Sequence, residues 1–262
     1  MERDGRRLLF EGIHNCRDLG GLVTADGGRI REGLLLRSAR LTTATPKDIR
    51  DLREQLHISE ILDLRNTFEQ EEHPDVPVPG AVHVDLPILD FQQEGITHEE
   101  AAKLPAYERW PRMADLYVKF ILEEPLNHNL ANAVRRVFTH DYDSGAALWH
   151  CFGGKDRCGM VAALTLTVLG VSYDVVKEDY LLTNIVGKPQ AERAYAEVLE
   201  RGGSRREADF LYEANIADEN FLDSAFDAIQ KQYGDAVTFL MQMGSVTPSE
   251  IDAFKKRVIY TG

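Results

Sequence analysis

Short apolar runs alternate with helical patterns in the first half of the chain. Four runs bounded by polar residues predict buried strands, at residues 34–36, 60–64, 81–86 and 146–150. Between the first two, the sequence Thr-Pro-Lys-Asp at 45–48 predicts the start of a helix. The threonine hydroxyl can cap such a helix, proline fits its first position and the aspartate can reach back to the cap. Strands that alternate with helices are typical of a mainly parallel α/β sheet flanked by helices.

The pattern changes after residue 86. Residues 90–109 are polar and show no clear period, and apolar residues then recur at helical spacing over 113–121 and 130–138. We therefore predict a helical insertion at 92–140, before the fourth strand. Such an insertion would serve as a lid or only as a helical cap on the sheet.

The chain is helical in pattern from Met160 onward. One apolar face falls at 221–229 and is expected to end near Gly234, and a second Thr-Pro capping pattern begins at Thr247. Residues 185–262 are therefore expected to form a helical C-terminal part. Because no linker rich in Gly, Ser or Pro divides the sequence, residues 1–262 are predicted to form a single domain.

The charge balance is acidic, with 30 Lys and Arg against 43 Asp and Glu in 262 residues, a net charge of −13. Binding to nucleic acid or to anionic membranes needs a basic surface, so neither is expected. An anionic substrate remains compatible with this charge, because salt screens the rest of the protein from a small, locally positive site.

Three cysteines, Cys16, Cys151 and Cys158, are too few for a disulfide framework and lack the Cys-x-x-Cys spacing of a structural zinc site. The most apolar stretch, 160–171, is too short to cross a bilayer, which takes about 20 residues. The charged N-terminus is not followed by an apolar signal core. A cytoplasmic protein without membrane insertion is expected, and secretion of a chain whose signal has been removed stays open.

The segment at 150–159 carries the clearest chemistry, with the sequence His-Cys-Phe-Gly-Gly-Lys-Asp-Arg-Cys-Gly. It follows a predicted strand and opens a predicted helix, so its backbone N–H groups and the helix dipole converge on one spot. Gly153 and Gly154 permit the tight turn, and Arg157, six residues after Cys151, can fold its guanidinium over the loop. The loop is predicted to bind a phosphate group.

Cys151 would lie at the floor of this loop as a nucleophile. A helix N-terminus and nearby cations lower the pKa of a cysteine from about 8.5, so the field that binds phosphate also favours the thiolate. Attack on a bound phosphoryl group would give a phosphocysteine, which water then hydrolyses. Backbone amides and Arg157 would neutralise the developing charge, so neither a metal nor a cofactor is expected.

Several ordered motifs add to this loop. They are Asn-Cys-Arg-Asp-Leu-Gly-Gly at 15–21, Gly-Leu-Leu-Leu-Arg-Ser at 33–38, Asp-Leu-Arg at 63–65 and Asp-Tyr-Leu-Leu-Thr-Asn at 179–184. Together with His-Cys-x-x-Gly-Lys-Asp-Arg-x-Gly, they resemble the bacterial and fungal tyrosine-phosphatase family from about residue 12 to residue 184. The resemblance implies a cysteine-phosphatase fold and hydrolysis of phosphotyrosine. Relatives of this kind often accept phosphoserine or phosphothreonine, and some accept phosphoinositides.

The resemblance also implies roles for individual residues. Asp90, in Leu-Pro-x-x-Asp after the third strand, takes the family's general-acid position, although a loop aspartate that caps a turn is the alternative. Asp156 competes for this role and would need protonation, or pairing with Arg17 or Arg65. Lys155 would meet a second phosphate of a lipid headgroup, or be an ordinary solvated lysine. The expected substrate-binding residues are Phe152, Gly153, Gly154, Lys155, Asp156 and Arg17.

Two supporting residues have more than one interpretation. Arg17 belongs to a turn that is structural in itself, but the family places this turn beside the active site, where Arg17 would touch substrate or support Asp156. His150 is either a buried core histidine or a residue that orders the loop and stabilises the thiolate.

Cys158 departs from the family pattern, which has Thr or Ser after the loop arginine. Because a thiol is a weaker hydrogen-bond donor than a hydroxyl, hydrolysis of the phosphocysteine would be slow. Alternatively, Cys158 would trap oxidised Cys151 as a disulfide, giving a redox-regulated enzyme. A small apolar filler at the helix start is the simplest interpretation.

Two other functions remain open at this point. A pseudophosphatase would bind phosphate on the same loop without turning over, and Cys158 is the feature that favours it. Sulfur or arsenate chemistry also uses Cys-x5-Arg loops, but the motif at 15–21 and Asp90 favour a phosphatase. The expected partners are phosphorylated proteins, small phosphoesters or phosphoinositides.

Overall fold

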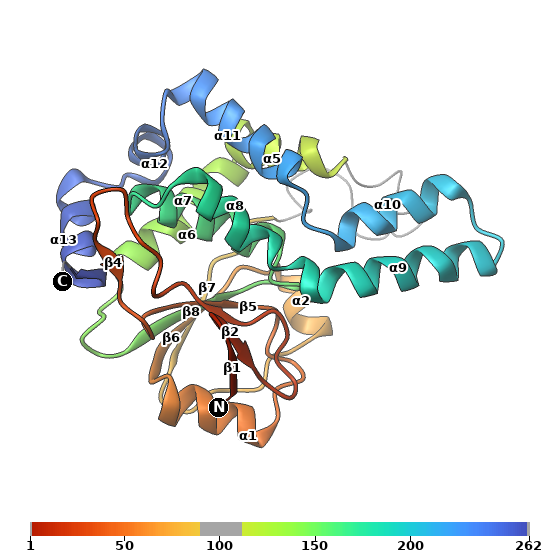
Figure 1. Cartoon of the computed structure of the whole chain (residues 1–262), viewed down its shortest axis with the longest axis horizontal. Coiled ribbons are helices and arrows are strands. Elements are labelled where there is room, and N and C mark those ends of the chain that lie inside the picture. Colours follow the sequence, from red (N-terminus) through yellow and green to blue (C-terminus); the bar gives the residue numbers. More distant parts are fainter. Residues whose placement is uncertain (1, 90–111, 261–262) are drawn as a thin grey trace.

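A seven-stranded sheet lies at the centre of the computed structural model, which describes residues 2–89 and 112–260 (Figure 1). Its strands, in spatial order, are β1 (Glu2–Asp4), β2 (Arg7–Leu9), β3 (Arg17–Asp18), β5 (Leu35–Ser38), β8 (Ala146–His150), β6 (Ile58–Asp63) and β7 (Val82–Asp85). The last four strands in this order are parallel, and β1, β2, β3 and β5 pair antiparallel. The prediction of a mainly parallel core is confirmed for the four strands that the hydrophobic pattern identified.

The three inner parallel strands, β5, β8 and β6, bury both of their faces. The edge strand β7 is mostly exposed, so the prediction of a buried strand at 81–86 is right about the strand and wrong about its burial. Leu35, Leu62 and Trp149 belong to a larger hydrophobic core, whereas the neighbouring Leu36 and Leu148 belong to a smaller one on the opposite face. Successive side chains of a strand point to opposite sides, so one short run supplies both cores. This explains why these strands are continuous apolar runs, whereas β1, whose three polar residues are all exposed, gave no such signal.

Helix boundaries follow local capping signals. The helix α1 (Pro46–Arg50) has the reciprocal capping bonds between Thr45 and Asp48, and it continues as one π-helical segment, η1 (Asp51–Gln55). The same arrangement starts α13 (Pro248–Val258) at Thr247, and α11 (Glu219–Tyr233) ends at Gly234 in the left-handed region, at φ 83°. These predictions are confirmed because each depends on residues adjacent in sequence.

The described part of the predicted insertion is a cap on the sheet. It contains α5 (Met113–Leu122) and α6 (Leu126–Thr139), whose apolar faces are buried in the larger core. Residues 90–111, with the predicted general acid Asp90, lie outside the described residues.

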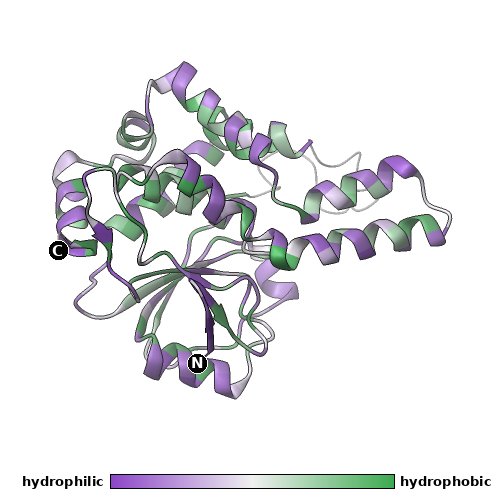
Figure 2. Cartoon of the chain, in the orientation of Figure 1, coloured by the Kyte–Doolittle hydropathy of each residue, from purple (hydrophilic) through white to green (hydrophobic). Residues whose placement is uncertain are grey.

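The remaining helices are α2 (Thr67–Glu72), α7 (Asp156–Val168), α8 (Tyr173–Leu181), α9 (Asn184–Glu200), α10 (Arg205–Asn215) and α12 (Ala236–Gly244). The helices α9 and α10 form a hairpin that extends from the body of the molecule (Figure 1) and carries interspersed polar and apolar residues (Figure 2). The chain then closes with a short strand, β9 (Ile259–Tyr260), which pairs antiparallel with β4 (Arg29–Ile30). Residues 185–258 thus form helices joined by short connections, and the sequence pattern did not predict the strand β9 that follows them.

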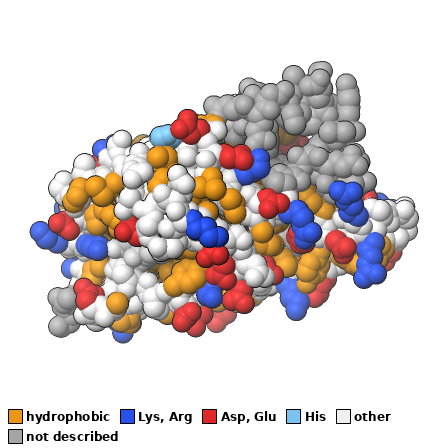
Figure 3. Space-filling view, turned by 90° about the horizontal axis from the view of Figure 1, so that it is seen from above, with side chains coloured by type: hydrophobic (Ala, Val, Ile, Leu, Met, Phe, Trp, Pro, Cys, Tyr) orange, Lys and Arg blue, Asp and Glu red, His pale blue; other side chains and the backbone are white. Residues whose placement is uncertain are grey.

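On the face seen in Figure 3, acidic and basic side chains are interspersed among apolar ones. Among the residues that the structure describes, no helix combines the length and the apolar character needed to cross a membrane.

Candidate active site

The chemistry-bearing segment joins the end of β8 to the start of α7, the strand-to-helix setting expected from the sequence. Cys151 follows the last residue of the strand, and Asp156 and Arg157 begin the helix. These residues line a cavity of about 520 Å³ together with Phe152 and the loop backbone. The sheet therefore presents the segment at the carboxyl end of a central parallel strand, where ligands bind in open α/β sheets.

Two side chains from the N-terminal part of the protein shape the loop. Asn15 Nδ2 donates to the carbonyls of Gly153 and Gly154, each at 3.1 Å. Arg37 Nη2 donates to the carbonyls of Gly154 and Lys155 at 2.8 and 3.3 Å. Because the N–H and C=O of a trans peptide point in opposite directions, holding these carbonyls on one side leaves the amides for an anion on the other.

Gly154 is required at its position for two reasons. Its φ of 67° lies in the left-handed region, and a Cβ atom there would lie 2.6 Å from the backbone of Ser38. Any other residue would push the loop away from β5. By contrast, a Cβ on Gly153 would meet no atom within 4 Å, so this glycine is not required by packing.

Cys151 is almost fully buried, at 2% exposed. Burial alone would raise the pKa of its thiol. A hydrogen bond from the Cys158 side chain, the positive charge of Arg157 and the Cys158 backbone amide together outweigh burial and lower the pKa to about 6. The sulfur is therefore mainly a thiolate at neutral pH, which is the nucleophilic form.

Arg157 is held in place by Glu69 of α2. Its Nη1 and Nη2 donate to the two carboxylate oxygens at 2.5 and 2.7 Å. Burial opposes the charge of this guanidinium, but Glu69 and Cys151 together raise its pKa. Glu69 also accepts from the backbone of Asn66, the cap of α2, so a helix end fixes the carboxylate that orients the arginine.

Asp156 and Lys155 form a polar cluster at the start of α7. The Asp156 carboxylate accepts from Tyr117 Oη at 2.9 Å and lies 3.1 Å from Lys155 Nζ. The expected pairing of Asp156 with Arg17 or Arg65 is wrong, because Lys155 and Tyr117 are its neighbours and the two arginines are engaged elsewhere.

Lys155 itself is buried, at 5% exposed, so the interpretation as a solvated lysine is wrong. Its ammonium donates to the carbonyls of Glu213 and Ile216, at 3.4 and 2.9 Å, at the C-terminal end of α10. A cation is favoured there because helix carbonyls lack partners in the last turn. The α9–α10 hairpin is thus tied to the loop through this side chain.

Arg17 does not take the substrate-binding position expected of it. It is 1% exposed, and its Nε and Nη2 donate to the carboxylate and carbonyl oxygens of Asp179 while Nη1 donates to Asn15. Burial and the nearby Arg37 lower its pKa to about 10. The structural interpretation of its turn is the one that the contacts support: Arg17 orients Asn15, and Asn15 holds the loop.

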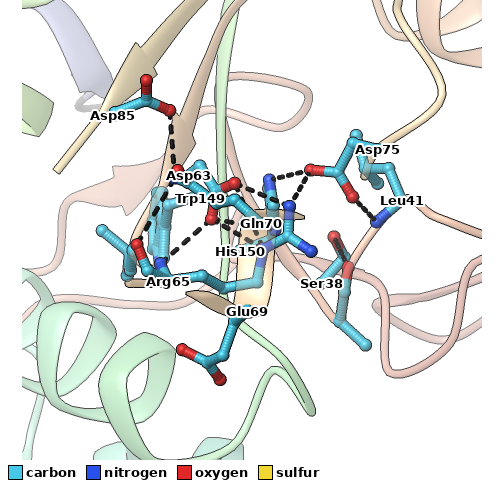
Figure 4. A network of polar contacts seen from close by, with 12 residues as sticks. Ser38, Leu41, Asp63, Arg65, Glu69, Gln70, Asp75, Asp85, Trp149 and His150 are labelled. Carbon is cyan, nitrogen blue, oxygen red and sulfur yellow. Dashed lines mark hydrogen bonds and ion pairs between the residues drawn. The ribbon is translucent and has the colours of Figure 1, made fainter. Parts of the chain in front are cut away.

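His150 lies beneath the loop in a buried polar network (Figure 4). Its Nε2 is 3.1 Å from Asp75 and its Nδ1 is 3.9 Å from Asp63. Burial opposes its protonation, but the two carboxylates raise its pKa. His150 is therefore a buried core histidine that lies beside two aspartates beneath the loop.

Asp63, Asp75 and His150 are also the one group of described residues spaced closely enough to hold a metal ion. The guanidinium of Arg65 donates to both carboxylates, each at 2.7 Å (Figure 4). Because this cation already occupies the space between them, the group does not fit a metal site.

Phe152 stands at the mouth of the cavity, at 36% exposed. The guanidinium of Arg40 lies over its ring, 3.9 Å from the centroid, and His73 meets the ring edge-on at 5.3 Å. The side chain that follows Cys151 is therefore held in place by two neighbouring side chains.

Cys158 is fully buried, and no disulfide links it to Cys16 or Cys151. Its thiol faces the carbonyls of Ser38 and Trp149, at 3.6 and 3.9 Å, besides the sulfur of Cys151. Burial and the neighbouring Cys151 raise the pKa of this thiol, so it stays protonated as a donor. Cys158 packs in the larger hydrophobic core, as the filler interpretation expects, and its thiol also interacts with the sulfur of Cys151.

Four residues at this site were not assigned a role from the sequence: Asn15, Arg37, Glu69 and Asp179. Glu69 left a signal, because Asn66-x-x-Glu69 is a capping box that predicts the start of α2 beside the Asp-Leu-Arg motif. Asn15, Arg37 and Asp179 belong to motifs that the sequence analysis identified. Their hydrogen-bond partners at this site are more than 100 residues away in the sequence, so the motifs did not reveal them.

Known proteins resemble this chain over most of its length. A protein of Cupriavidus necator named as a putative tyrosine-protein phosphatase is 28% identical over 240 residues, covering 89% of this chain and 82% of its own. The triple specificity protein phosphatase PtpB of Mycobacterium tuberculosis is 30% identical over 208 residues, covering 72% of this chain and 73% of its own. The crystal structure of PTPMT1 superimposes on 76% of this chain and 96% of its own, with 12% identity and a TM-score of 0.34.

The sequence model of the tyrosine phosphatase family matches residues 8–260, which include strands β3 to β9 and every described helix. This chain therefore belongs to the tyrosine phosphatase family and is a phosphatase.

Proposed function

We propose that this protein hydrolyses phosphotyrosine through a phosphocysteine intermediate formed on Cys151, without a metal ion. The observation that carries the proposal is the state of Cys151. A buried thiol whose pKa is lowered to about 6 lies at the base of an amide-lined loop, next to the fixed guanidinium of Arg157. A nucleophile and an anion-binding site in one loop are what phosphoryl transfer to sulfur requires.

In the first step, the Cys151 thiolate attacks phosphorus, the S–P bond forms and the ester P–O bond breaks. The loop amides and Arg157 stabilise the charge on the equatorial oxygens. The leaving phenoxide takes a proton from a general acid, and we assign this role to Asp90 from its place after β7. Asp156 fits the role less well, because Tyr117 and Lys155 already donate to its carboxylate.

In the second step, water attacks phosphorus and gives a proton to the Asp90 carboxylate left by the first step, the S–P bond breaks, and the thiolate and phosphate are released. A hydrogen bond to the departing sulfur assists this step, and Cys158 is the side chain in position to donate it. A thiol donates weakly, so we propose that this step is slow and that phosphocysteine accumulates.

The proposed substrate class is phosphotyrosine, and phosphoserine and phosphothreonine fit the same phosphate-binding loop. The name of the mycobacterial relative, a triple specificity phosphatase, supports this breadth. Lys155 was the sequence feature that favoured phosphoinositides. Its ammonium is occupied by Asp156 and two carbonyls, so this feature no longer favours a lipid over a protein substrate.

The test is release of p-nitrophenol from p-nitrophenyl phosphate in EDTA and reductant, comparing the wild type with Cys151→Ser and with the control Cys16→Ala. Cys16 is buried and its thiol pKa is raised by burial, so its removal leaves the proposed chemistry intact. Sustained turnover that only Cys151→Ser abolishes supports the proposal.

Two other results would replace it. Phosphate binding with no product in the wild type would favour a pseudophosphatase on the same loop. Turnover that survives in Cys151→Ser would reject the cysteine mechanism altogether.

A further inference from the structure

A second, smaller cavity of about 90 Å³ lies beside the cavity that holds Cys151. His14, Asn15 and Val186 line both cavities, so the two share a wall. Asn15 is fixed in this wall, because its side chain donates to two carbonyls of the loop that carries Cys151. The side cavity therefore keeps a constant position relative to the proposed nucleophile.

The lining of the side cavity is mainly apolar. Leu8, Ile13 and Cys16 are its most buried members, at most 4% exposed. Phe10 and Leu182 also line it and are half-buried. An apolar group that entered this space would leave water for contact with aliphatic and aromatic side chains, which is favourable.

The two arginines that border the side cavity already have carboxylate partners. Arg7 donates to Asp4 at 2.8 Å, and Arg17 donates to Asp179 at 3.2 Å. A bound anion would have to compete with these partners. The lining therefore favours an apolar occupant over an anionic one.

The volume of the side cavity limits the size of its occupant. An apolar cavity of about 150 Å³ inside a protein is large enough to bind benzene. A cavity of about 90 Å³ is too small for an aromatic ring and suits a branched aliphatic side chain such as that of leucine.

We infer that the side cavity is a specificity subsite, which binds the aliphatic side chain of a residue that flanks phosphotyrosine in a peptide substrate. The inference rests on the proposed phosphotyrosine hydrolysis and adds a sequence preference to it. Because the two cavities share a wall, a peptide whose phosphotyrosine reaches Cys151 brings its neighbouring residue to the side cavity.

Three phosphotyrosine peptides of equal length test the subsite, with alanine, leucine or phenylalanine on both sides of phosphotyrosine. For the wild type, we expect kcat/KM to be about tenfold higher for the leucine peptide than for the alanine peptide, as for a side chain that fills an apolar pocket. The phenylalanine peptide should gain little over alanine, because its ring does not fit. The leucine preference should not weaken as salt is raised, since no charge takes part in it.

Two variants should change the preference in opposite directions. Cys16 is the smallest residue that lines the side cavity, so Cys16→Phe should fill it and bring the leucine-to-alanine ratio near one. Leu182→Ala should enlarge it and raise the phenylalanine-to-leucine ratio about tenfold. The control Leu199→Ala removes an exposed leucine outside both cavities and should leave both ratios unchanged.

Each ratio is taken within one variant, so a general loss of activity cancels, and Leu182→Ala tests the subsite even if Cys16→Phe does not fold. Equal rates for the alanine and leucine peptides in the wild type would overturn the subsite, leave the side cavity as a packing gap and keep the phosphatase proposal standing. A leucine preference that neither cavity variant alters would do the same. Failure of the wild type to hydrolyse any of the peptides would instead overturn both proposals.

Discussion

The guanidinium of Arg157 and the carboxylate of Glu69 form two parallel hydrogen bonds, at 2.5 and 2.7 Å. Glu69 belongs to α2 and Arg157 to α7, so the N-terminal ends of two helices meet at the loop that carries Cys151. A planar fork held on one edge by a carboxylate can rotate little. The orientation of Arg157 is therefore set before any ligand binds.

Replacing Glu69 by glutamine should reduce kcat/KM for p-nitrophenyl phosphate by about 10–50-fold, because a neutral amide cannot hold both Nη groups. The amide oxygen can still cap α2, so the fold should persist, with an unchanged circular dichroism spectrum. Glu71→Gln, an exposed change on the same helix, is the matched control. Equal activity of the two variants would show that Glu69 does not orient Arg157.

The lowered pKa of Cys151 predicts how alkylation depends on pH. The rate of its reaction with iodoacetamide should rise with pH to a plateau with a midpoint near 6, because only the thiolate reacts. Mass spectrometry of the labelled peptide assigns the site, and Cys16, whose thiol pKa is raised by burial, should stay unlabelled. A midpoint near the ordinary cysteine value of about 8.5 would contradict the proposed thiolate.

The variant Cys158→Thr should speed the second chemical step, because a hydroxyl donates to the departing sulfur better than a thiol. In rapid-quench experiments, the wild type should release close to one equivalent of p-nitrophenol in a burst, followed by a slower steady rate. The variant should show a smaller burst and a higher kcat. Absence of a burst in the wild type would mean that phosphocysteine hydrolysis is not the slow step.

Contact between Cys151 and Cys158 also predicts a response to peroxide. Peroxide would oxidise the Cys151 thiolate to a sulfenic acid with loss of hydroxide, and the Cys158 thiol would condense with it, forming a disulfide and releasing water. Peptide mapping should find the linked pair, and reductant should restore activity. In Cys158→Ala, activity should be lost irreversibly as Cys151 proceeds to sulfinic acid. Sulfinic acid in the wild type without a link would reject this protection.

Asp179 is a buried carboxylate surrounded by Arg6, Arg17 and Arg37. Its replacement by asparagine should lower the free energy of unfolding by about 3–5 kcal/mol, because two buried guanidinium groups would lose their counter-ion. Denaturant titration measures the change, with the exposed Glu178→Gln on the same helix as control. A loss below about 1 kcal/mol would show that the arginines find other partners.

The stabilisation that the Asp179 carboxylate contributes should depend on pH. Burial would raise the pKa of Asp179, but the three arginines lower it well below its usual range. The stabilisation is therefore present above the unfolded pKa, near 3.9, and is lost as pH falls below it. The difference between wild type and Asp179→Asn should be constant above about pH 5 and should shrink in acid.

Features set by neighbouring residues were the predictable ones. Thr45 and Asp48 are three residues apart, and their capping bonds follow from their spacing alone. The strand before Cys151 and the helix after Arg157 were also local patterns. By contrast, Arg17 was expected at the substrate, and its actual partner Asp179 is 162 residues away. No periodicity encodes such a pair, nor the pairing of β4 with β9. The family resemblance predicted which segments meet at the site, but it did not predict the side-chain contacts between them.

The two side-chain donors that shape the loop at 153–155 have a consequence for how the protein folds. Asn15 is 138 residues from the Gly153 carbonyl that it holds, and Arg37 is 117 residues from Gly154. The loop cannot take its shape until the N-terminal strands have joined the sheet. An isolated C-terminal fragment would therefore contain the Cys-x5-Arg sequence without the folded site. Contacts of such sequence separation form slowly. During synthesis and refolding, catalytic competence should therefore be among the last properties that this chain acquires.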